Sequence, residues 1–213
     1  MSAVHDMVVS SLEEAVQATL AGRRVEAEKA LTGIVVSRPS LDTSTLLRQP
    51  AEAHLAKRKS VSPATQLLIY RRDNFTCRYC GRQTLFTPLV RLLSSLYPAT
   101  FPYHKNWKLG ACHLLYWTHT VSLEHVIPVA AGGTNEPNNL VTTCYWCNDW
   151  KTHWTLEQLG WTLHPSTTTS WDGLSQHYSA LYEMSRQVRG TTAEPYFGQW
   201  LRALTHAIAK SAI

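Results

Sequence analysis

Long apolar runs are missing from this sequence of 213 residues. No run approaches the roughly 18 consecutive apolar residues that a membrane-spanning helix needs. The N-terminal residues 1–10 also lack the basic start and the long apolar middle of a secretory signal. The sequence therefore predicts a protein with no membrane partner, and we place it in the cytoplasm.

Charged residues are also few, at 16% of the chain against 44% hydrophobic residues. This composition excludes a disordered chain and indicates a globular protein, long enough for one domain with or without appended helices. The sequence contains no internal repeat and no low-complexity tract. A formal net charge of +5 suits a polyanionic partner, but it fits a basic protein without such a partner equally well.

Cysteine is sparse, yet its spacing is informative. Four of the five cysteines form two C-x-x-C pairs: Cys77 with Cys80, and Cys144 with Cys147. In a cytosolic chain this spacing predicts a tetrahedral structural zinc site and not disulfides. Gly81 follows the first pair, where a tight metal knuckle needs a permissive backbone. The remaining Cys112 is expected to be a small buried apolar residue and not a fifth ligand.

Most of the other chemistry lies in one ordered set of segments. They are Glu124-His125-Val126-Ile127-Pro128, Gly132-Gly133, Asn139-Leu140 and Cys144-Tyr145-Trp146-Cys147-Asn148-Asp149-Trp150-Lys151. The order of carboxylate, histidine, glycine loop, asparagine, metal-ligand pair and second asparagine resembles the HNH endonuclease family. The resemblance implies a ββα-metal fold, in which two short strands and a helix hold one divalent ion against a scissile phosphate.

The resemblance also implies a role for each polar residue. His125 would be the general base, a task that suits an imidazole because its unperturbed pKa is about 6.5. Glu124 and Asn148 would be oxygen ligands of a catalytic Mg²⁺ or Mn²⁺, ions that prefer oxygen donors. Asn139 would either orient the base or tie the hairpin loop by hydrogen bonds.

Two of these positions depart from the commonest family pattern. Glu124 stands where aspartate is common, and Asn148 stands where many members have histidine. Histidine at the last position would favour zinc or another transition metal, whereas asparagine favours Mg²⁺. His153 is an alternative ligand, although five residues after Asn148 is a poor helical spacing for sharing one ion.

Helical periodicity and capping residues predict helices on both sides of this motif. Residues 10–32 are expected to form one amphipathic helix ending at Gly33, and residues 34–49 a linker. Further helices are expected over residues 51–59, 171–188 and 195–208, and after the start signals Ser62-Pro63, Thr87-Pro88 and Thr155. The helix after Pro63 would turn Leu67, Leu68 and Tyr70 inward.

The gap between Cys80 and Glu124 is longer than in compact family members and predicts an insertion at about residues 82–113. Aromatic and basic residues alternate there, including Phe101, Tyr103 and Trp107. Two interpretations are open: a strand-binding groove, or packing over the zinc site, which we favour. Residues 114–121 are rich in β-formers and are expected to form a strand that leads to Glu124.

The sequence thus predicts an α+β protein with a small ββα-metal nuclease core and a structural zinc site. Mostly helical N- and C-terminal segments flank this core. The expected boundaries are residues 1–60 for a helical N-terminal extension, 61–154 for the core with its insertion, and 155–213 for a helical C-terminal extension that packs on the core.

The expected activity is metal-dependent hydrolysis of DNA, with Arg71, Arg72 and Lys151 contacting the nucleic acid. The alternative is a zinc-organised nucleic-acid-binding protein without cleavage. The Glu124-His125 pair and Asn148 favour the nuclease, because pure binding requires neither. A third hypothesis is a toxin or interaction protein whose helical flanks carry the nuclease core. Oligomeric state and the choice between DNA and RNA remain open at this stage.

Overall fold

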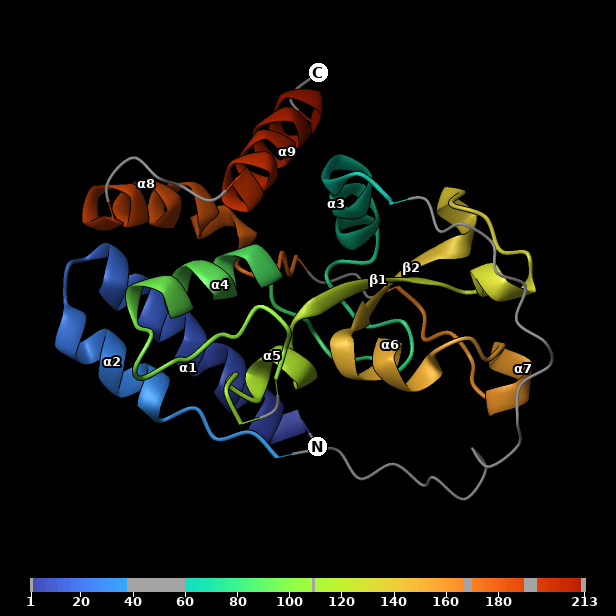
Figure 1. Ribbon diagram of the computed structural model, residues 1–213, viewed down its shortest axis with the longest axis horizontal. Helices are drawn as coiled ribbons and strands as arrows, with labels where there is room; N and C mark the ends of the chain where they lie inside the picture. The colour runs from blue at the N-terminus through green and yellow to red at the C-terminus, as the bar shows by residue number, and fades with distance from the viewer. Residues whose placement is uncertain (1, 38–59, 109, 167–169, 190–194, 212–213) are drawn as a thin grey trace.

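The computed structural model describes residues 2–37, 60–108, 110–166, 170–189 and 195–211 (Figure 1). The helix expected over residues 51–59 lies outside this part of the chain, as does most of the linker expected over residues 34–49. None of the helices in the described ranges is both long enough and apolar enough to cross a membrane.

A small hairpin and one helix stand beside a larger helical body (Figure 1). Strands β1 (Val121–His125) and β2 (Leu140–Cys144) pair antiparallel, with Glu124 opposite Val141 and His125 opposite Leu140. Helix α6 (Tyr145–Lys151) follows β2 directly and packs on both strands. The described chain therefore contains the predicted ββα unit within an α+β fold.

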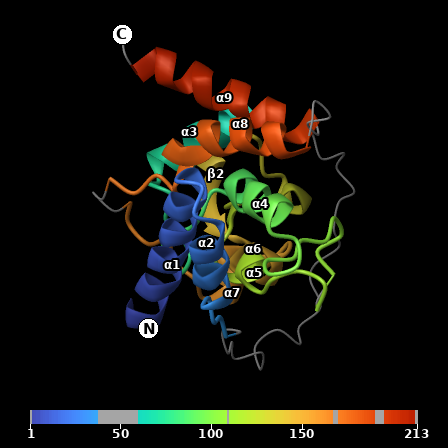
Figure 2. The same cartoon turned by 90° about the vertical axis from the view of Figure 1, so that its left-hand side faces the viewer.

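The helical body surrounds the main hydrophobic core. Its helices are α1 (Ser2–Leu20), α2 (Arg24–Thr32), α3 (Pro63–Arg72), α4 (Thr87–Leu96), α5 (Leu115–Thr118), α8 (Tyr178–Arg189) and α9 (Pro195–Ser211). Figure 2 shows α1, α2 and α4 side by side below α8 and α9. Backbone hydrogen bonds join this body to the hairpin: Leu85 N donates to His119 O, and Val121 N donates to Leu85 O.

Several predicted helix starts are confirmed by their caps. Ser62 Oγ accepts a hydrogen bond from Thr65 N at the start of α3, and Pro63 occupies the first turn. A complete capping box between Thr155 and Gln158 opens α7 (Leu156–Leu159), and Gly160 ends it with a left-handed φ of 63°. Helices α4 and α9 begin at Thr87 and Pro195, as expected.

Two predicted helices and one predicted strand are wrong in part. The helix expected over residues 10–32 is two helices, because the chain turns at Gly22 with a left-handed φ of 71°. The strand expected over residues 114–121 is mostly α5, where both the amide and the hydroxyl of Thr118 donate to Leu114 O. The helix expected from residue 171 begins only at Tyr178, because the Asp172 carboxylate accepts from the Leu174 and Gln176 amides and holds a turn there.

The inner face of α3 also differs from the prediction at one position. Leu67 and Tyr70 are buried as expected, but Leu68 is 57% exposed and Ile69 is buried in its place. The helix is thus rotated slightly so that Ile69 faces the core and its carbonyl accepts a hydrogen bond from Thr142 Oγ1 of β2.

The aromatic residues of the insertion do not pack over the paired cysteines. Trp107 lies parallel to Tyr145 at 4.3 Å between ring centroids and meets Tyr116 and Trp117 edge-on. The side chains over the cysteines are different ones, chiefly Tyr79 and Trp161. The favoured interpretation of the insertion is therefore wrong, and its aromatic residues face the start of α6 and the helical body instead.

Candidate functional site

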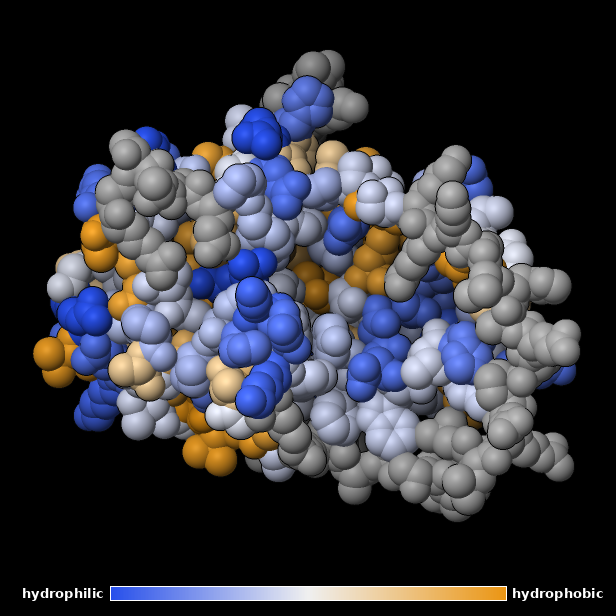
Figure 3. Space-filling model, viewed as in Figure 1, coloured by the Kyte–Doolittle hydropathy of each residue, from blue (hydrophilic) through white to orange (hydrophobic). Residues whose placement is uncertain are grey.

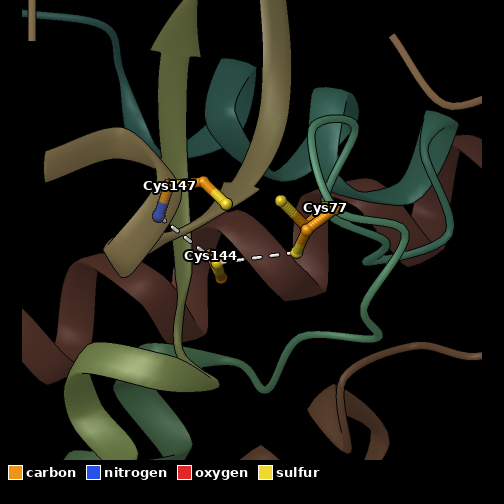
Figure 4. Close-up of side chains that lie close together, drawn as sticks. Cys77, Cys144 and Cys147 are labelled. Carbon is orange, nitrogen blue, oxygen red and sulfur yellow. Dashed lines mark hydrogen bonds between the residues drawn. The ribbon is translucent and has the colours of Figure 1, made fainter. Parts of the chain in front are cut away.

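The paired cysteines converge from two distant parts of the chain. The sulfur atoms of Cys77, Cys80, Cys144 and Cys147 all lie within 4.8 Å of one another. Figure 4 shows three of them facing one another beside the start of α6. The Sγ atoms of Cys80 and Cys144 are 4.0 Å apart, close to the roughly 3.8 Å expected between sulfurs of a tetrahedral site with metal–sulfur bonds of about 2.3 Å. The four residues are thus positioned to bind one metal ion, and Cys112 is not among them.

Local backbone geometry explains why the sulfurs meet. Gly81 adopts a left-handed φ of 71° and its amide donates to Cys77 O, which closes the predicted knuckle. Cys144 is the N-cap of α6, and its sulfur accepts a hydrogen bond from Cys147 N at 3.5 Å. The first turn of α6 therefore brings the sulfurs of the second pair together.

The four thiols also influence one another's protonation. Hydrogen bonds from Cys144, Cys147 and Cys77 lower the pKa of the Cys80 thiol far below its ordinary value. Hydrogen bonding to Cys147 and the other cysteines, together with burial, raises the pKa of Cys144 well above its ordinary value. Negative charge is thus favoured on the exposed sulfur of Cys80, where a bound cation would compensate it.

A buried carboxylate joins this knuckle to the hairpin. Asp73 is fully buried and accepts hydrogen bonds from Arg72, from Arg78 and from the backbone amide of Thr142 in β2. Arg72 also donates to Pro137 O and Leu140 O at 2.7 Å each. The Arg72 guanidinium thus has several partners within the fold, although the side chain is 40% exposed. Arg71 beside it is half-buried.

A cavity of about 320 Å³, here called the hairpin cavity, lies where β1 ends and α6 ends. Its lining residues are Glu124, His125, Pro128, Val129, Ala130, Asn148, Asp149, Thr152 and His153. The structure thus brings together Glu124, His125 and Asn148, the residues predicted as base and ligands. It adds Asp149, which the sequence analysis did not single out, and the alternative ligand His153.

His125 is held by a residue that the sequence analysis missed. The His125 side chain is 4% exposed, and its Nε2 lies 2.8 Å from Asn135 Oδ1. With this oxygen as acceptor, the ring proton is on Nε2 and Nδ1 is the basic nitrogen. Asn135 lies in the loop between the strands, and its spacing from His125 carries no recognisable signal.

Asn139 ties the hairpin loop, one of the two roles considered for it. Its Oδ1 accepts from Ile127 N, while its Nδ2 donates to Ile127 O and Thr134 O. Gly133 lies against the same strand exit, where an added Cβ would be 1.8 Å from Ile127 O. The glycine and the asparagine together set the path of the chain just after His125.

Lys151 does not lie where a nucleic-acid contact would be. Its side chain is fully buried, and its Nζ donates to Glu124 Oε1 at 2.9 Å and to His125 O at 2.8 Å. The prediction that Lys151 contacts nucleic acid is therefore wrong for this conformation. Its ammonium instead ties the last turn of α6 to the end of β1 and compensates the charge of Glu124.

Asn148 is oriented by β1. Its Nδ2 donates to Ser122 Oγ at 2.8 Å and to Leu123 O at 3.0 Å. Because the amide nitrogen is committed to the strand, Oδ1 is the atom that Asn148 can offer to a cation. Thr152 then ends α6 with a φ of 47°, and the next residue, His153, returns to the hairpin cavity.

Comparison with known families gives a match to this part of the chain. Residues 112–163 match the family model described as HNH endonuclease. This match supports the resemblance that the order of residues in the same segment predicted. No curated protein and no solved structure matches the chain.

The HNH segment contains the whole hairpin, α6 and the lining of the hairpin cavity. It includes Cys144 and Cys147 but not Cys77 and Cys80, which come from the knuckle after α3. The cluster of four cysteines is therefore shared between the HNH segment and the part of the chain that precedes it.

Proposed function

We propose that this protein is a metal-dependent endonuclease that hydrolyses phosphodiester bonds in DNA, with His125 as the general base. One observation carries the proposal: Glu124, His125 and Asn148 line the same cavity of the HNH segment. An HNH endonuclease segment implies a nucleic-acid substrate, and the net charge of +5 is compatible with DNA. Arg71 and the exposed Arg72 remain our candidates for contacts to the DNA backbone.

Zinc is the metal that we assign to the four cysteines. Four thiolates in a closed tetrahedral set are typical of structural zinc, and no coordination position is left for a substrate. The ion would join the knuckle at Cys77 to the start of α6 at Cys144. Its role is therefore to hold the hairpin and α6 in place and not to take part in hydrolysis.

The oxygen donors of the hairpin cavity fit Mg²⁺ or Mn²⁺. Lys151 binds Glu124 Oε1, so Oε2 is the carboxylate oxygen that Glu124 would offer to the ion. Asn148 would offer Oδ1, because its amide nitrogen is bound to β1. When bound, such an ion acts as a Lewis acid and stabilises the leaving alkoxide.

His125 would take the proton of the attacking water on Nδ1. Asn135 accepts from Nε2 and so fixes both the tautomer and the orientation of the ring. Lys151 donates to the backbone carbonyl of His125, which holds the end of β1 against α6. The base is thus held from both its side chain and its backbone.

A second function also has an observation in its favour. Glu124 and Asn148 have structural partners in Lys151 and Ser122, which a metal-organised binding protein without cleavage would equally use. The two functions differ in whether His125 has a chemical task. Substitution of this residue therefore separates them.

The test is cleavage of a supercoiled plasmid in Mg²⁺, in Mn²⁺ or in EDTA by the full chain and by His125→Ala. Loss of a positioned base lowers rates by roughly 10²- to 10⁴-fold, so His125→Ala should leave almost no cutting. His177→Ala is the control, because His177 is half-buried in the helical body and away from the hairpin cavity. Metal-dependent cutting by a folded His125→Ala protein at the normal rate would refute this mechanism.

A further inference from the structure

A larger cavity of about 700 Å³, here called the aromatic cavity, borders His125 as well. Residues of α3, α4, β1 and α9 and of the insertion line it. Figure 3 shows a recess with apolar side chains near the centre of this face of the molecule. His125 lines both cavities, so a ligand group in the aromatic cavity would lie next to the reacting atoms.

The lining of the aromatic cavity is unusual in its charge and ring content. Its described lining contains His125 but no Asp, Glu, Lys or Arg. It also contains five aromatic rings, those of Tyr70, Trp107, Tyr145, Tyr196 and Trp200. The side-chain amides of Gln66 and Gln199 also line it. Such a surface offers no cation to a phosphate, but it offers ring faces and hydrogen-bonding amides to a flat, neutral, polar ligand.

Tyr70 and Trp200 are buried, so the rings that a ligand could reach are those of Trp107, Tyr145 and Tyr196, the last with Arg91 over its ring at 3.7 Å. Trp107 and Tyr145 form a parallel stack with 16° between their planes, and both are half-buried. Burial raises the pKa of Tyr196 to about 12, so this side chain remains a neutral phenol at physiological pH. Trp107 also has a left-handed φ of 51°, which is uncommon for a bulky residue and marks a position that its surroundings hold in place.

We propose that the aromatic cavity binds an unpaired base of the DNA, next to the phosphate that the hairpin cavity presents to His125. This inference rests on the proposed nuclease function. A base has the required flat face and polar edge, and stacking on aromatic side chains recognises any base. A base within a duplex is stacked on its neighbours, so it enters such a cavity only when it is unpaired or has left the helix.

The cavity also explains what the segments outside the family match contribute. Ser62, Pro63 and Gln66 of the α3 region and Tyr196 and Gln199 of α9 line it, and all lie outside residues 112–163. The HNH segment would supply the hydrolytic residues, and the flanking helices would select the substrate. The preferred substrate is therefore DNA with an unpaired nucleotide beside the scissile bond, such as a bulge or a flap junction.

The test measures binding to three duplexes of one sequence by fluorescence anisotropy: fully paired, with a single bulged nucleotide, and with an abasic residue at the bulge. EDTA is added just before each titration to prevent cutting, and zinc content is checked afterwards. Stacking is lost without a base, so the abasic duplex should bind about 5- to 100-fold more weakly than the bulged one. Tyr196→Leu should remove most of this difference, while Tyr182→Leu, a half-buried tyrosine of α8 that does not line the cavity, should preserve it.

Plasmid cleavage under Mg²⁺ separates the two proposals. Equal affinity for bulged and abasic duplexes, in a protein that still cuts plasmid, would overturn the base-binding inference and leave the nuclease intact. Absence of both cutting and binding for every substrate would overturn the nuclease proposal, and the base-binding inference with it. A base-dependent difference that Tyr196→Leu leaves unchanged would place the base elsewhere and also overturn the inference.

Discussion

The two ends of helix α6 hold two polar sites of very different construction. At its start, Cys144 and Cys147 join a cluster of four identical ligand atoms. At its end, Asn148 and Lys151 belong to a group of an amide, an ammonium, a carboxylate and an imidazole. All members of the first site would bind one ion. In the second site Glu124, His125 and Asn148 each have a structural partner as well as a proposed chemical task, and Lys151 is one of those partners.

This difference predicts how each site responds to damage. Loss of one thiol removes a ligand from a closed set, so the whole site should fail together. Loss of one side chain at the hairpin cavity leaves only its own partners with an unsatisfied hydrogen bond or an uncompensated charge. The cysteine cluster should therefore give all-or-none effects, and the hairpin cavity should give graded ones.

The largest effect is expected from Cys80→Ser. Binding of structural zinc contributes on the order of 10 kcal/mol or more to folding, so the hairpin and α6 should unfold and not merely lose activity. Metal analysis and thermal unfolding by circular dichroism measure the two consequences. Cys112→Ser is the control: Cys112 is buried in the main core and lies outside the cluster, so the variant should keep its zinc and lose only about 1–2 kcal/mol. A folded Cys80→Ser protein with full zinc content would show that the cluster is not the zinc site.

The next largest effect is expected from Lys151→Met. Removal of one partner from a buried ion pair costs about 3–5 kcal/mol, because Glu124 would keep a buried charge without compensation. Lys105→Met removes the same charge from an exposed position of the insertion and should cost far less. Chemical denaturation of both variants measures the difference.

The Lys151→Met variant also tests whether Glu124 is a ligand of the catalytic ion. If Glu124 offers an oxygen to Mg²⁺, the ion should stabilise Lys151→Met more than it stabilises the unsubstituted protein, because the ion replaces the missing positive charge. Equal stabilisation of both proteins by Mg²⁺ would argue that Glu124 is only the partner of Lys151.

The two sites also differ in how far the sequence alone predicted them. The C-x-x-C spacing identified all four cysteines, because each pair needs only its own local turn to present two sulfurs. The order of Glu124, His125, Asn139 and Asn148 placed the hairpin and α6 correctly through a family resemblance. The partners of these residues were not predictable, since they depend on tertiary contacts: Asn135 reaches His125 across the loop, and Lys151 turns inward to Glu124.

In the helical flanks, too, local features were predictable from the sequence and tertiary contacts were not. Caps such as Ser62 and Thr155 act within one turn of helix, so their sequences predicted the start of α3 and α7. The segment at residues 114–121 has a β-rich composition, but hydrogen bonds from Thr118 to Leu114 O give α5 instead. The position of the insertion's aromatic residues depends on Tyr145, which is distant in sequence, and no local pattern indicates that contact.

The smallest effect is expected from Asn135, which we regard as a positioning residue for His125. Asn135→Ala should slow plasmid cleavage by roughly 10-fold, since the ring loses the acceptor that fixes its orientation and tautomer. Asn138→Ala is the matched control, an exposed asparagine of the same loop that does not line the hairpin cavity. Both variants should remain folded, because their side chains are exposed.

Asn135→Asp separates positioning of the base from a general effect on the loop. A carboxylate restores the acceptor but favours the protonated imidazole, so more alkaline solution is needed to free Nδ1. The acidic limb of the pH–rate profile should therefore move to higher pH in Asn135→Asp, with the maximal rate largely recovered relative to Asn135→Ala. The cysteine cluster offers no such graded response, because a thiol either binds the ion or does not. If the acidic limb stays in place while the rate falls, Asn135 acts on the loop and not on the base, and the proton acceptor must be sought elsewhere in the hairpin cavity.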